Sequence, residues 1–373
     1  MSKLISREIL LVLSVILSLT LVLPVAACAT KAPEAASVVN VRIHSQMPVG
    51  HYVTESVDLF IKEAEARSKG TLKFSHYPAQ QLYTDMAMAN VLPDGGVEMA
   101  QIQAMMFAGK VPEIFGGLLP GFYKDQDHYF RAAYDAGPDG GFMDRVIAPA
   151  FEEKANTKML TCMGYSINLC TLTNKPVYKL EDYKGKKIRS LGKSVSVLLQ
   201  ALGAVPAMIS SSDVYMALQR GTIEGVFSGL TSFYERKWYE SAKYVQYYYT
   251  GSANFNMAAN LTFWNKLTPA QRKAIAEAAL IAEVYSIERA MADESRAREG
   301  LKAAGVEVFD FPAAEVKRLH ELARTPLTEM LEEDLGKELA TQILTTLDAS
   351  REAKATWKDA CEKHGKRLLA ELK

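Results

Sequence analysis

The sequence predicts an α/β protein built from two α/β units and one long helix. The chain has 373 residues, of which 49% are hydrophobic, and this length favours two packed domains over one. Strands alternate with helices in two separate runs, over 38–103 and 158–227, which is typical of mainly parallel sheets. A third segment, beginning at Thr268, has the composition of a helix longer than those of ordinary globular domains.

The first run begins with a strand, because Val39, Val41 and Ile43 alternate with polar residues. Gly70 ends the helix that follows this strand. The elements expected after the first strand are a helix over 52–68, a strand over 72–77, a short helix over 85–92 and a strand over 97–103.

The second run repeats the alternation. Its helices are followed by Gly203 and Gly221, and glycine commonly ends a helix because it adopts left-handed backbone angles. The expected elements are a β-rich stretch over 158–172, a strand over 186–190, helices over 194–202 and 213–220, and a strand over 222–227.

The long helix has a clear start. Thr268 and Gln271 form a capping box with Pro269 at the first helical position. No further Gly or Pro occurs before Gly300, and the helical composition continues to Gly305. A helix of this length would extend about 50 Å and could lie across two domains. Two helices that separate near Gly300 remain an alternative.

The C-terminal region is expected to be helical. A strand is predicted over 306–311, and helices follow from Ala313 to the end of the chain. A break is predicted at Pro326, because proline lacks the amide hydrogen that a helix interior needs.

The N-terminus carries an export signal. Basic residues precede an apolar stretch over 9–27, and small residues lead to Cys28. This arrangement predicts a secretory signal peptide over 1–27. Residues 25–28 also resemble a bacterial lipobox, in which the cysteine is lipidated. We favour this lipid-anchored form over a plain cleaved signal or an uncleaved membrane anchor. Residues 28–37 are expected to form a tether, and the protein is expected in the periplasm.

Composition argues against several classes of function. The 43 basic and 43 acidic side chains form no long block of one sign, so nucleic acid is not an expected partner. Three cysteines follow Cys28, namely Cys162, Cys170 and Cys361, and an odd number argues against a disulfide framework. Cys162 and Cys170 could pair, but buried free thiols are favoured. No Cys/His cluster has zinc spacing, and neither a metal nor a cofactor is expected.

No common catalytic motif is found in the sequence. The nucleophile elbow, the phosphate-binding P-loop and the dinucleotide-binding glycine pattern are all missing. His320 and Glu321 begin like a zinc-protease helix, but Arg324 stands where the second histidine is needed. These absences lower the expectation of an enzyme.

A pair of α/β domains can instead close on a small ligand. Ligands of open α/β sheets bind at the carboxyl ends of the strands, and Arg189 lies at such an end. A guanidinium can grip a carboxylate through two parallel hydrogen bonds. From its position alone, Arg189 as an ordinary surface residue is the more common alternative.

Several ordered motifs are specific enough to indicate a family. Residues 180–189 read L-E-D-Y-K-G-K-K-I-R, residues 213–221 read D-V-Y-M-A-L-Q-R-G, and Thr222-Ile-Glu-Gly225 follows. They resemble the L-x-D-hydrophobic-K-G-x-K-I-R, E-V-Y-x-A-L-Q-x-G and V-D-G stretches of the DctP-type solute-binding proteins of TRAP transporters. The resemblance runs from about residue 39 into the C-terminal region. Shorter matches lie at 80–82, 240–245 and 264–269.

This resemblance implies a two-lobed, periplasmic-binding-protein-like α/β fold with a hinge, a central cleft and a long helix spanning both lobes. Lobe I would contain 38–160 and about 250–285, and lobe II would contain 161–249 and about 286–373. The resemblance also implies that Arg189 holds the carboxylate of the ligand. TRAP membrane subunits would be the partners of a monomeric protein.

Other residues expected in the pocket depart from the family pattern. Many members carry a second arginine where this chain has Leu169, beside Asn168. Ser228 replaces an asparagine that often binds carboxylate, Ser211 stands where some relatives carry an aromatic residue, and Ser252 stands where some carry histidine. The expected pocket therefore has one strong cation and several hydroxyls.

Such a pocket suits a monocarboxylate with a hydroxylated or aromatic body, and a dicarboxylate is less expected. Phe227, Tyr234 and Trp238 could line it, although packing elsewhere is the stronger expectation for Tyr234 and Trp238. Three polar residues near strand ends of the N-terminal lobe are further candidates: Gln46, Tyr52 and Gln81. Ordinary loop roles are equally open for these three.

We therefore expect a protein that captures a small organic carboxylate for a TRAP transporter. A ligand-sensing module of a signalling system is the main alternative. A secreted enzyme and a binding protein of an ABC importer are weaker ones, since no residue set supports turnover and the long helix argues against the importer.

Overall fold

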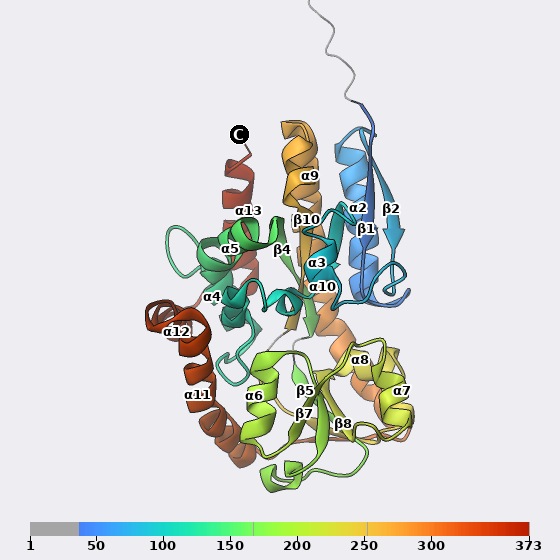
Figure 1. Ribbon diagram of the computed structural model, residues 1–373, viewed down its shortest axis with the longest axis vertical. Coiled ribbons are helices and arrows are strands. Elements are labelled where there is room, and N and C mark those ends of the chain that lie inside the picture. The colour runs from blue at the N-terminus through green and yellow to red at the C-terminus, as the bar shows by residue number, and fades with distance from the viewer. Residues whose placement is uncertain (1–36, 167, 252, 373) are drawn as a thin grey trace, which may run out of the picture. The chain divides into compact units, whose positions relative to one another are not determined.

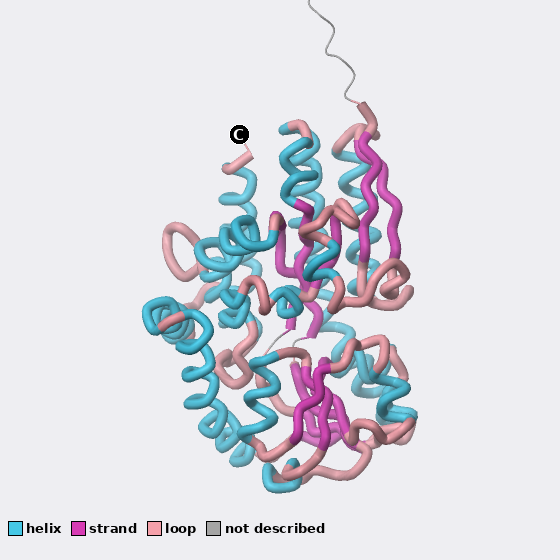
Figure 2. Tube along the Cα trace, viewed as in Figure 1, coloured by secondary structure: helices cyan, strands magenta, loops and turns pink. Residues whose placement is uncertain are grey.

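The computed structural model describes residues 37–166, 168–251 and 253–372. The predicted signal peptide, the lipobox with Cys28, the tether up to residue 36, and Ser252 lie outside these ranges. Figures 1 and 2 show two separate groups of strands, each covered by helices. We call the elements around the first sheet the first lobe and those around the second sheet the second lobe.

The first sheet has five strands in the order β2-β1-β3-β10-β4. β1 pairs in parallel with β2 and β3, whereas β10 runs antiparallel to both of its neighbours, β3 and β4. The strands are β1 Val39–His44, β2 Leu72–Tyr77, β3 Met99–Ile102, β4 Thr157–Ser166 and β10 Ala253–Asn260.

The second sheet has six strands in the order β11-β9-β5-β8-β6-β7. β6 is parallel to β7 and β8, and β11 is parallel to β9, whereas β5 runs antiparallel to β8 and β9. The strands are β5 Leu169–Thr173, β6 Lys187–Ser190, β7 Val205–Met208, β8 Gly225–Gly229, β9 Tyr244–Tyr247 and β11 Glu307–Asp310.

The prediction of mainly parallel sheets is confirmed, since in each sheet all strands but one run in the same direction. The strands that run the other way are β10 in the first sheet and β5 in the second, and both lie where the chain crosses between the sheets. β4 of the first sheet continues into β5 of the second, and β9 of the second continues into β10 of the first. β5 and β10, the first strands after the two crossings, are therefore the strands that run against the other strands of their sheets.

Helices surround the two sheets, and most lie where the sequence predicts them. The short helix expected over 85–92 is a single turn, and the strand expected over 222–227 begins later, so that Ser228 belongs to it. The helices are α2 Tyr52–Arg67, α3 Met88–Val91, α4 Gln126–Tyr134, α5 Ala148–Ala155, α6 Lys193–Ala201, α7 Val214–Gln219, α8 Leu230–Glu235, α9 Leu261–Lys266, α10 Pro269–Ala303, α11 Ala313–Leu335, α12 Lys337–Ser350 and α13 Trp357–Ala370.

The long helix α10 is continuous over 35 residues, or about 52 Å. The predicted capping box is confirmed, because Thr268 Oγ1 accepts from the Gln271 amide and Gln271 Oε1 accepts from the Thr268 amide. The helix packs against α2 and β4 of the first lobe and against α8 and β11 of the second (Figure 1). Two helices separated near Gly300 are therefore the wrong alternative. A Cβ at Gly300 would meet the Tyr234 ring at 2.5 Å, so this glycine serves packing.

The predicted break at Pro326 is also wrong. α11 runs through Pro326 and ends before Gly336, whose φ is 77°. The missing proline amide would have bonded the carbonyl of Leu322, which lies on the exposed side of the helix, where water can solvate that carbonyl. Leu319 and Leu327 are fully buried on the other side, and this packing offsets the loss of one hydrogen bond.

The predicted residue bounds of the two lobes stay a prediction. Two observations bear on them. β4 pairs within the first sheet up to Ser166, beyond the expected boundary at residue 160. In addition, α12 and α13 pack against α4 of the first lobe, although they were expected in the second.

Candidate ligand-binding cleft

A small cavity of about 10 Å³ lies between the two lobes and is nearly filled by the side chains that line it. Both sheets contribute strand ends to its wall, which is where open α/β sheets bind ligands. The lining residues from the first lobe are Gln46, Met47, Gln103, Tyr165 and Phe255, and those from the second are Arg189, Leu191, Ser211, Ser228, Ser232, Arg236 and Trp238.

Arg189 is the first of two cations in this wall. It lies near the end of β6 with 1% of its surface exposed. Its Nε donates a 3.0 Å hydrogen bond to the carbonyl of Ile209, which fixes the plane of the guanidinium. Among the described residues, no hydrogen-bond partner is found for the two Nη nitrogens. Their N–H groups are therefore available to donate to a carboxylate. Burial lowers the pKa of Arg189 to about 10, so the side chain stays charged at neutral pH.

Arg236 is the second cation, and it follows the last residue of α8. Its Nη2 lies 3.3 Å from the carbonyl oxygen of Gln46 and 3.2 Å from Met47 Sδ. Its Nε is buried and has no hydrogen-bond partner in the part of the chain that the structure describes. The guanidinium carbon lies 6.0 Å from the centre of the Trp238 ring. Burial lowers the pKa of Arg236 as well.

Hydroxyl groups form another part of the wall. The Tyr165 hydroxyl is hydrogen-bonded to Ser232 and lies 3.3 Å from Ser228 Oγ. Both serines are at most 2% exposed. Hydroxyls both donate and accept, so this group can adapt to hydroxyl or carbonyl oxygens of a ligand.

A carboxylate of the first lobe bonds directly to the second. Asp85 accepts hydrogen bonds from Ser210 Oγ at 2.6 Å and from Ser211 Oγ at 2.9 Å. Gln46 Nε2 donates to both Asp85 and Ser211, and Gln80 Nε2 donates to Ser211. We call these five residues the lobe clasp, because their hydrogen bonds join the two lobes beside the cavity.

The charges around the cavity do not cancel. The carboxylate of Asp85 favours the charged forms of both Arg189 and Arg236 and so raises the pKa of each. Two neighbouring histidines are neutral at pH 7, since burial lowers the pKa of His44 to about 4 and that of His51 to about 3. Asp85 therefore offsets one of the two arginine charges of the cavity wall, and the other favours an anionic ligand.

The structure brings four of the predicted site residues together in the cavity wall: Gln46, Arg189, Ser211 and Ser228. Whether they bind a ligand stays a prediction. Phe227 precedes Ser228 on β8, so it points to the opposite face of the sheet, and it is fully buried in the core together with Leu169. Neither lines the cavity.

Three further predicted residues also lie outside the cavity wall. The Asn168 amide donates to the Tyr247 hydroxyl, and the Tyr52 hydroxyl donates to the Tyr165 carbonyl. Gln81 is exposed, and its neighbour Gln80 reaches Ser211 instead. Ser252 is outside the described residues.

Sequence reasoning missed Arg236, Tyr165, Ser232 and Asp85, and it expected Trp238 to pack elsewhere. One available signal was the spacing of Ser232 and Arg236, since residues four apart share a helical face. The charged run around Arg236 instead suggested a solvated helix start. α8 ends one residue earlier, and Lys237 adopts a left-handed φ of 56°, so the chain turns at this point.

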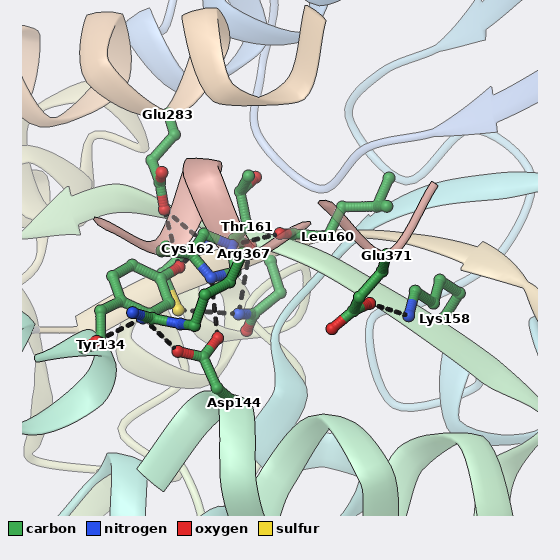
Figure 3. A network of polar contacts seen from close by, with 11 residues as sticks. Tyr134, Asp144, Lys158, Leu160, Thr161, Cys162, Glu283, Arg367 and Glu371 are labelled. Atoms are coloured by element: carbon green, nitrogen blue, oxygen red, sulfur yellow. Dashed lines mark hydrogen bonds and ion pairs between the residues drawn. The ribbon is translucent and has the colours of Figure 1, made fainter. Parts of the chain in front are cut away.

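Figure 3 shows a second polar cluster, and none of its labelled residues lines the cavity. Glu283 of α10 accepts hydrogen bonds from the Tyr134 hydroxyl at 2.7 Å and the Cys162 amide at 2.9 Å. Asp144 accepts from Arg367 of α13 at 2.6 Å and lies 2.8 Å from His364 Nδ1. Burial raises the pKa of Glu283 to about 7. These contacts join α10, β4 and α13 and belong to the core.

The cysteines of the described residues are free and buried, as favoured from the sequence: Cys162, Cys170 and Cys361. Pairing of Cys162 with Cys170 is therefore the wrong alternative. Burial raises the pKa of all three thiols, which makes them unreactive. Within the described ranges, no group of three or more His, Cys, Asp or Glu side chains could hold a metal ion.

Comparison with known proteins decides the family. The family described as bacterial extracellular solute-binding protein, family 7 (DctP), matches residues 43–334. The chain belongs to this family. The predicted resemblance and the two-lobed α/β fold are thus confirmed. In the described part of the chain, no helix combines the length and hydropathy required to cross a bilayer.

Relatives of the DctP family match most of this chain. A solute-binding protein of Albidiferax ferrireducens is 27% identical over 278 residues, which are 74% of this chain and 80% of the relative. The C4-dicarboxylate-binding periplasmic protein DctP of Rhodobacter capsulatus is 26% identical over 75% of this chain and 82% of its own length. A crystal structure of a TRAP periplasmic solute-binding protein from Roseobacter denitrificans with bound β-D-glucuronate has a TM-score of 0.76 and 20% identity. That match covers 85% of this chain and 100% of the solved one.

Proposed function

We propose that this DctP-family protein captures a small organic carboxylate in the cavity between its lobes and delivers it to TRAP membrane subunits. Arg189 carries the proposal. Its buried guanidinium lines the cavity and is held in place by the Ile209 carbonyl, and its Nη nitrogens have no hydrogen-bond partner among the described residues. A buried cation with free donors is matched best by a carboxylate, which can accept two parallel hydrogen bonds.

The ligands of similar proteins support the carboxylate class. The R. capsulatus relative is named for C4-dicarboxylates, and the R. denitrificans structure holds β-D-glucuronate. Both ligands are carboxylates, although one has two acidic groups and the other a single one on a hydroxylated ring. The serine hydroxyls near Arg189 favour a monocarboxylate with a hydroxylated or aromatic body, as the sequence predicts.

Export is part of the same proposal. The predicted signal peptide would direct the chain out of the cytoplasm, and lipidation of Cys28 would hold the folded residues near a membrane. A binding protein placed in this way can meet the membrane subunits after it has closed on its ligand. Mass spectrometry of the mature N-terminus would show whether Cys28 carries lipid.

The test is a thermal-shift screen of the chain without its predicted signal peptide against a library of organic acids. A ligand at a hundredfold excess over its Kd should stabilise the protein by about 2.7 kcal/mol. Arg189→Ala should then weaken binding of the best acid at least about a hundredfold, because two charge-assisted hydrogen bonds are lost. Arg189→Lys should weaken it less, because lysine keeps the charge but cannot bind in the same bidentate way.

Arg220→Ala is the matched control, since Arg220 is an exposed arginine of the second lobe outside the cavity wall. It should leave both the fold and the affinity unchanged. An Arg189→Ala protein that is folded and binds the acid as tightly as the wild type would refute the proposal. Stabilisation by sugars or amines but by no acid would refute it too.

A further inference from the structure

We propose that Arg236 is a second ligand-binding group, which binds an uncharged oxygen of an acid whose single carboxylate is held by Arg189. The inference rests on the proposed function and deepens it. It defines the ligand class as monocarboxylates that carry at least one hydroxyl or carbonyl oxygen at the end away from the carboxylate.

The first argument is the incomplete coordination of Arg236. A guanidinium has five N–H donors, and charge-assisted hydrogen bonds are usually about 2.7–2.9 Å long. The contacts of Arg236 Nη2 with the Gln46 carbonyl and Met47 Sδ are longer, at 3.3 and 3.2 Å. Its Nε is buried with no partner in the described ranges. A buried donor without an acceptor is unfavourable, so Arg236 has donor capacity that an oxygen of a ligand could satisfy.

The second argument is the polar surroundings of Arg236. Arg236 shares the cavity wall with Tyr165, Ser228 and Ser232, whose hydroxyls contact one another. Together these four side chains form a patch of donors and acceptors. Arg189 lines the same cavity, so one ligand can contact both guanidiniums.

The third argument is the count of charges, which separates a neutral oxygen from a second carboxylate. Arg189 and Arg236 face one carboxylate, Asp85, whose charge acts on both. Asp85 offsets one of the two arginine charges, and the neighbouring His44 and His51 are neutral. A singly charged acid would balance the charge of the other arginine. A dianion would leave a buried negative charge without compensation, which is strongly unfavourable in a closed site.

A purely structural role of Arg236 is the competing explanation. Its contact with the Gln46 carbonyl joins the two lobes, so its loss could weaken every ligand equally by making closure less favourable. The experiment must therefore compare ligands that differ in one oxygen, because a closure effect cancels in their ratio.

The experiment is isothermal titration calorimetry of wild type, Arg236→Met and Arg236→Gln with matched acids. The pairs are 4-hydroxybutyrate and butyrate, 4-oxopentanoate and pentanoate, and 4-hydroxycyclohexanecarboxylate and cyclohexanecarboxylate, and succinate serves as the dianion. The wild type should bind the oxygenated member of at least one pair at least tenfold tighter than its partner and tighter than succinate. In Arg236→Met this ratio should fall below threefold, and Arg236→Gln should retain part of it. Arg220→Ala, measured alongside, should keep the wild-type ratio.

Two results would overturn the inference. One is an unchanged ratio in folded Arg236→Met, which, if both members of a pair lose affinity equally, would mean that Arg236 acts through closure alone. The other is a wild-type preference for succinate. If one of these results were found while Arg189→Ala lost acid binding, the role of Arg236 would be refuted and the proposed function would stand. If the wild type bound no acid at all, both the proposed function and the role of Arg236 would be refuted.

Discussion

The buried carboxyl of Glu283 predicts an unusual pH dependence of stability, which the variant Glu283→Gln can test. The side chain is 0% exposed. One oxygen accepts from Tyr134 and from the Cys162 amide, and the other has no hydrogen-bond partner among the described residues (Figure 3). Glutamine keeps the shape and an accepting oxygen but cannot ionise, so the substitution removes the charge, together with its contribution to the raised pKa of His364.

The size of the effect follows from the pKa. Burial raises the pKa of Glu283 from its ordinary value of 4.5 to about 7. Between these two pH values, the folded protein binds more protons at this site than the unfolded chain does. The free energy of unfolding therefore falls as the pH rises through this window. The rise in pKa corresponds to about 3 kcal/mol, at about 1.4 kcal/mol for each pH unit.

Urea denaturation followed by circular dichroism at pH 4.5, 6, 7 and 8 measures this effect. Glu283→Gln should match the wild type at pH 4.5 and exceed it by about 2–3 kcal/mol at pH 8. Glu299→Gln, on the exposed face of the same helix, should change stability by less than about 0.5 kcal/mol at every pH. A difference between Glu283→Gln and wild type that does not change with pH would refute the reasoning, because a packing effect has no reason to titrate.

Other predictions concern the clasp, the long helix and the thiols. Asp85→Ala should remove the hydrogen bonds from Ser210 and Ser211 that join the lobes, and the radius of gyration measured by X-ray scattering should rise. An unchanged radius of gyration would contradict the claim that the lobe clasp holds the lobes together. Gly300→Ala should destabilise the protein by about 1–3 kcal/mol through overpacking against Tyr234, and Tyr234→Ala in the same chain should relieve most of that loss. The three buried thiols should resist a thiol reagent in the native protein and react in urea, whereas fewer than three reactive thiols in a chain lacking Cys28 would indicate a disulfide.

Local patterns in the sequence were enough to predict much of the fold. Alternating apolar residues identified β1, and the capping box at Thr268 identified the start of α10 to the residue. The position of Arg189 in the cavity wall agrees with what the family motif implies. These features depend on residues close together in the chain, which is the information that a single sequence holds most directly.

Features that depend on distant residues could not be predicted in this way. The antiparallel placement of β10 in the first sheet depends on pairing with β3 and β4, which are far away in the sequence. Continuation of α11 through Pro326 depends on tertiary packing of the helix, which local propensity does not include. Arg236 lies within a charged run that is typical of an exposed helix, and only the turn after α8 and the opposite lobe bury it.

The two strand crossings have a consequence for how the protein folds. β10 lies inside the first sheet between β3 and β4, yet it follows every strand of the second sheet except β11 along the chain. Until residue 260 is available, the first sheet has a gap, and the facing sides of β3 and β4 present unpaired backbone groups that can recruit other chains. The first lobe therefore cannot mature before most of the second lobe has been synthesised. We expect the described residues to unfold in urea as one cooperative transition, and nascent chains to depend on being kept unfolded until synthesis is complete.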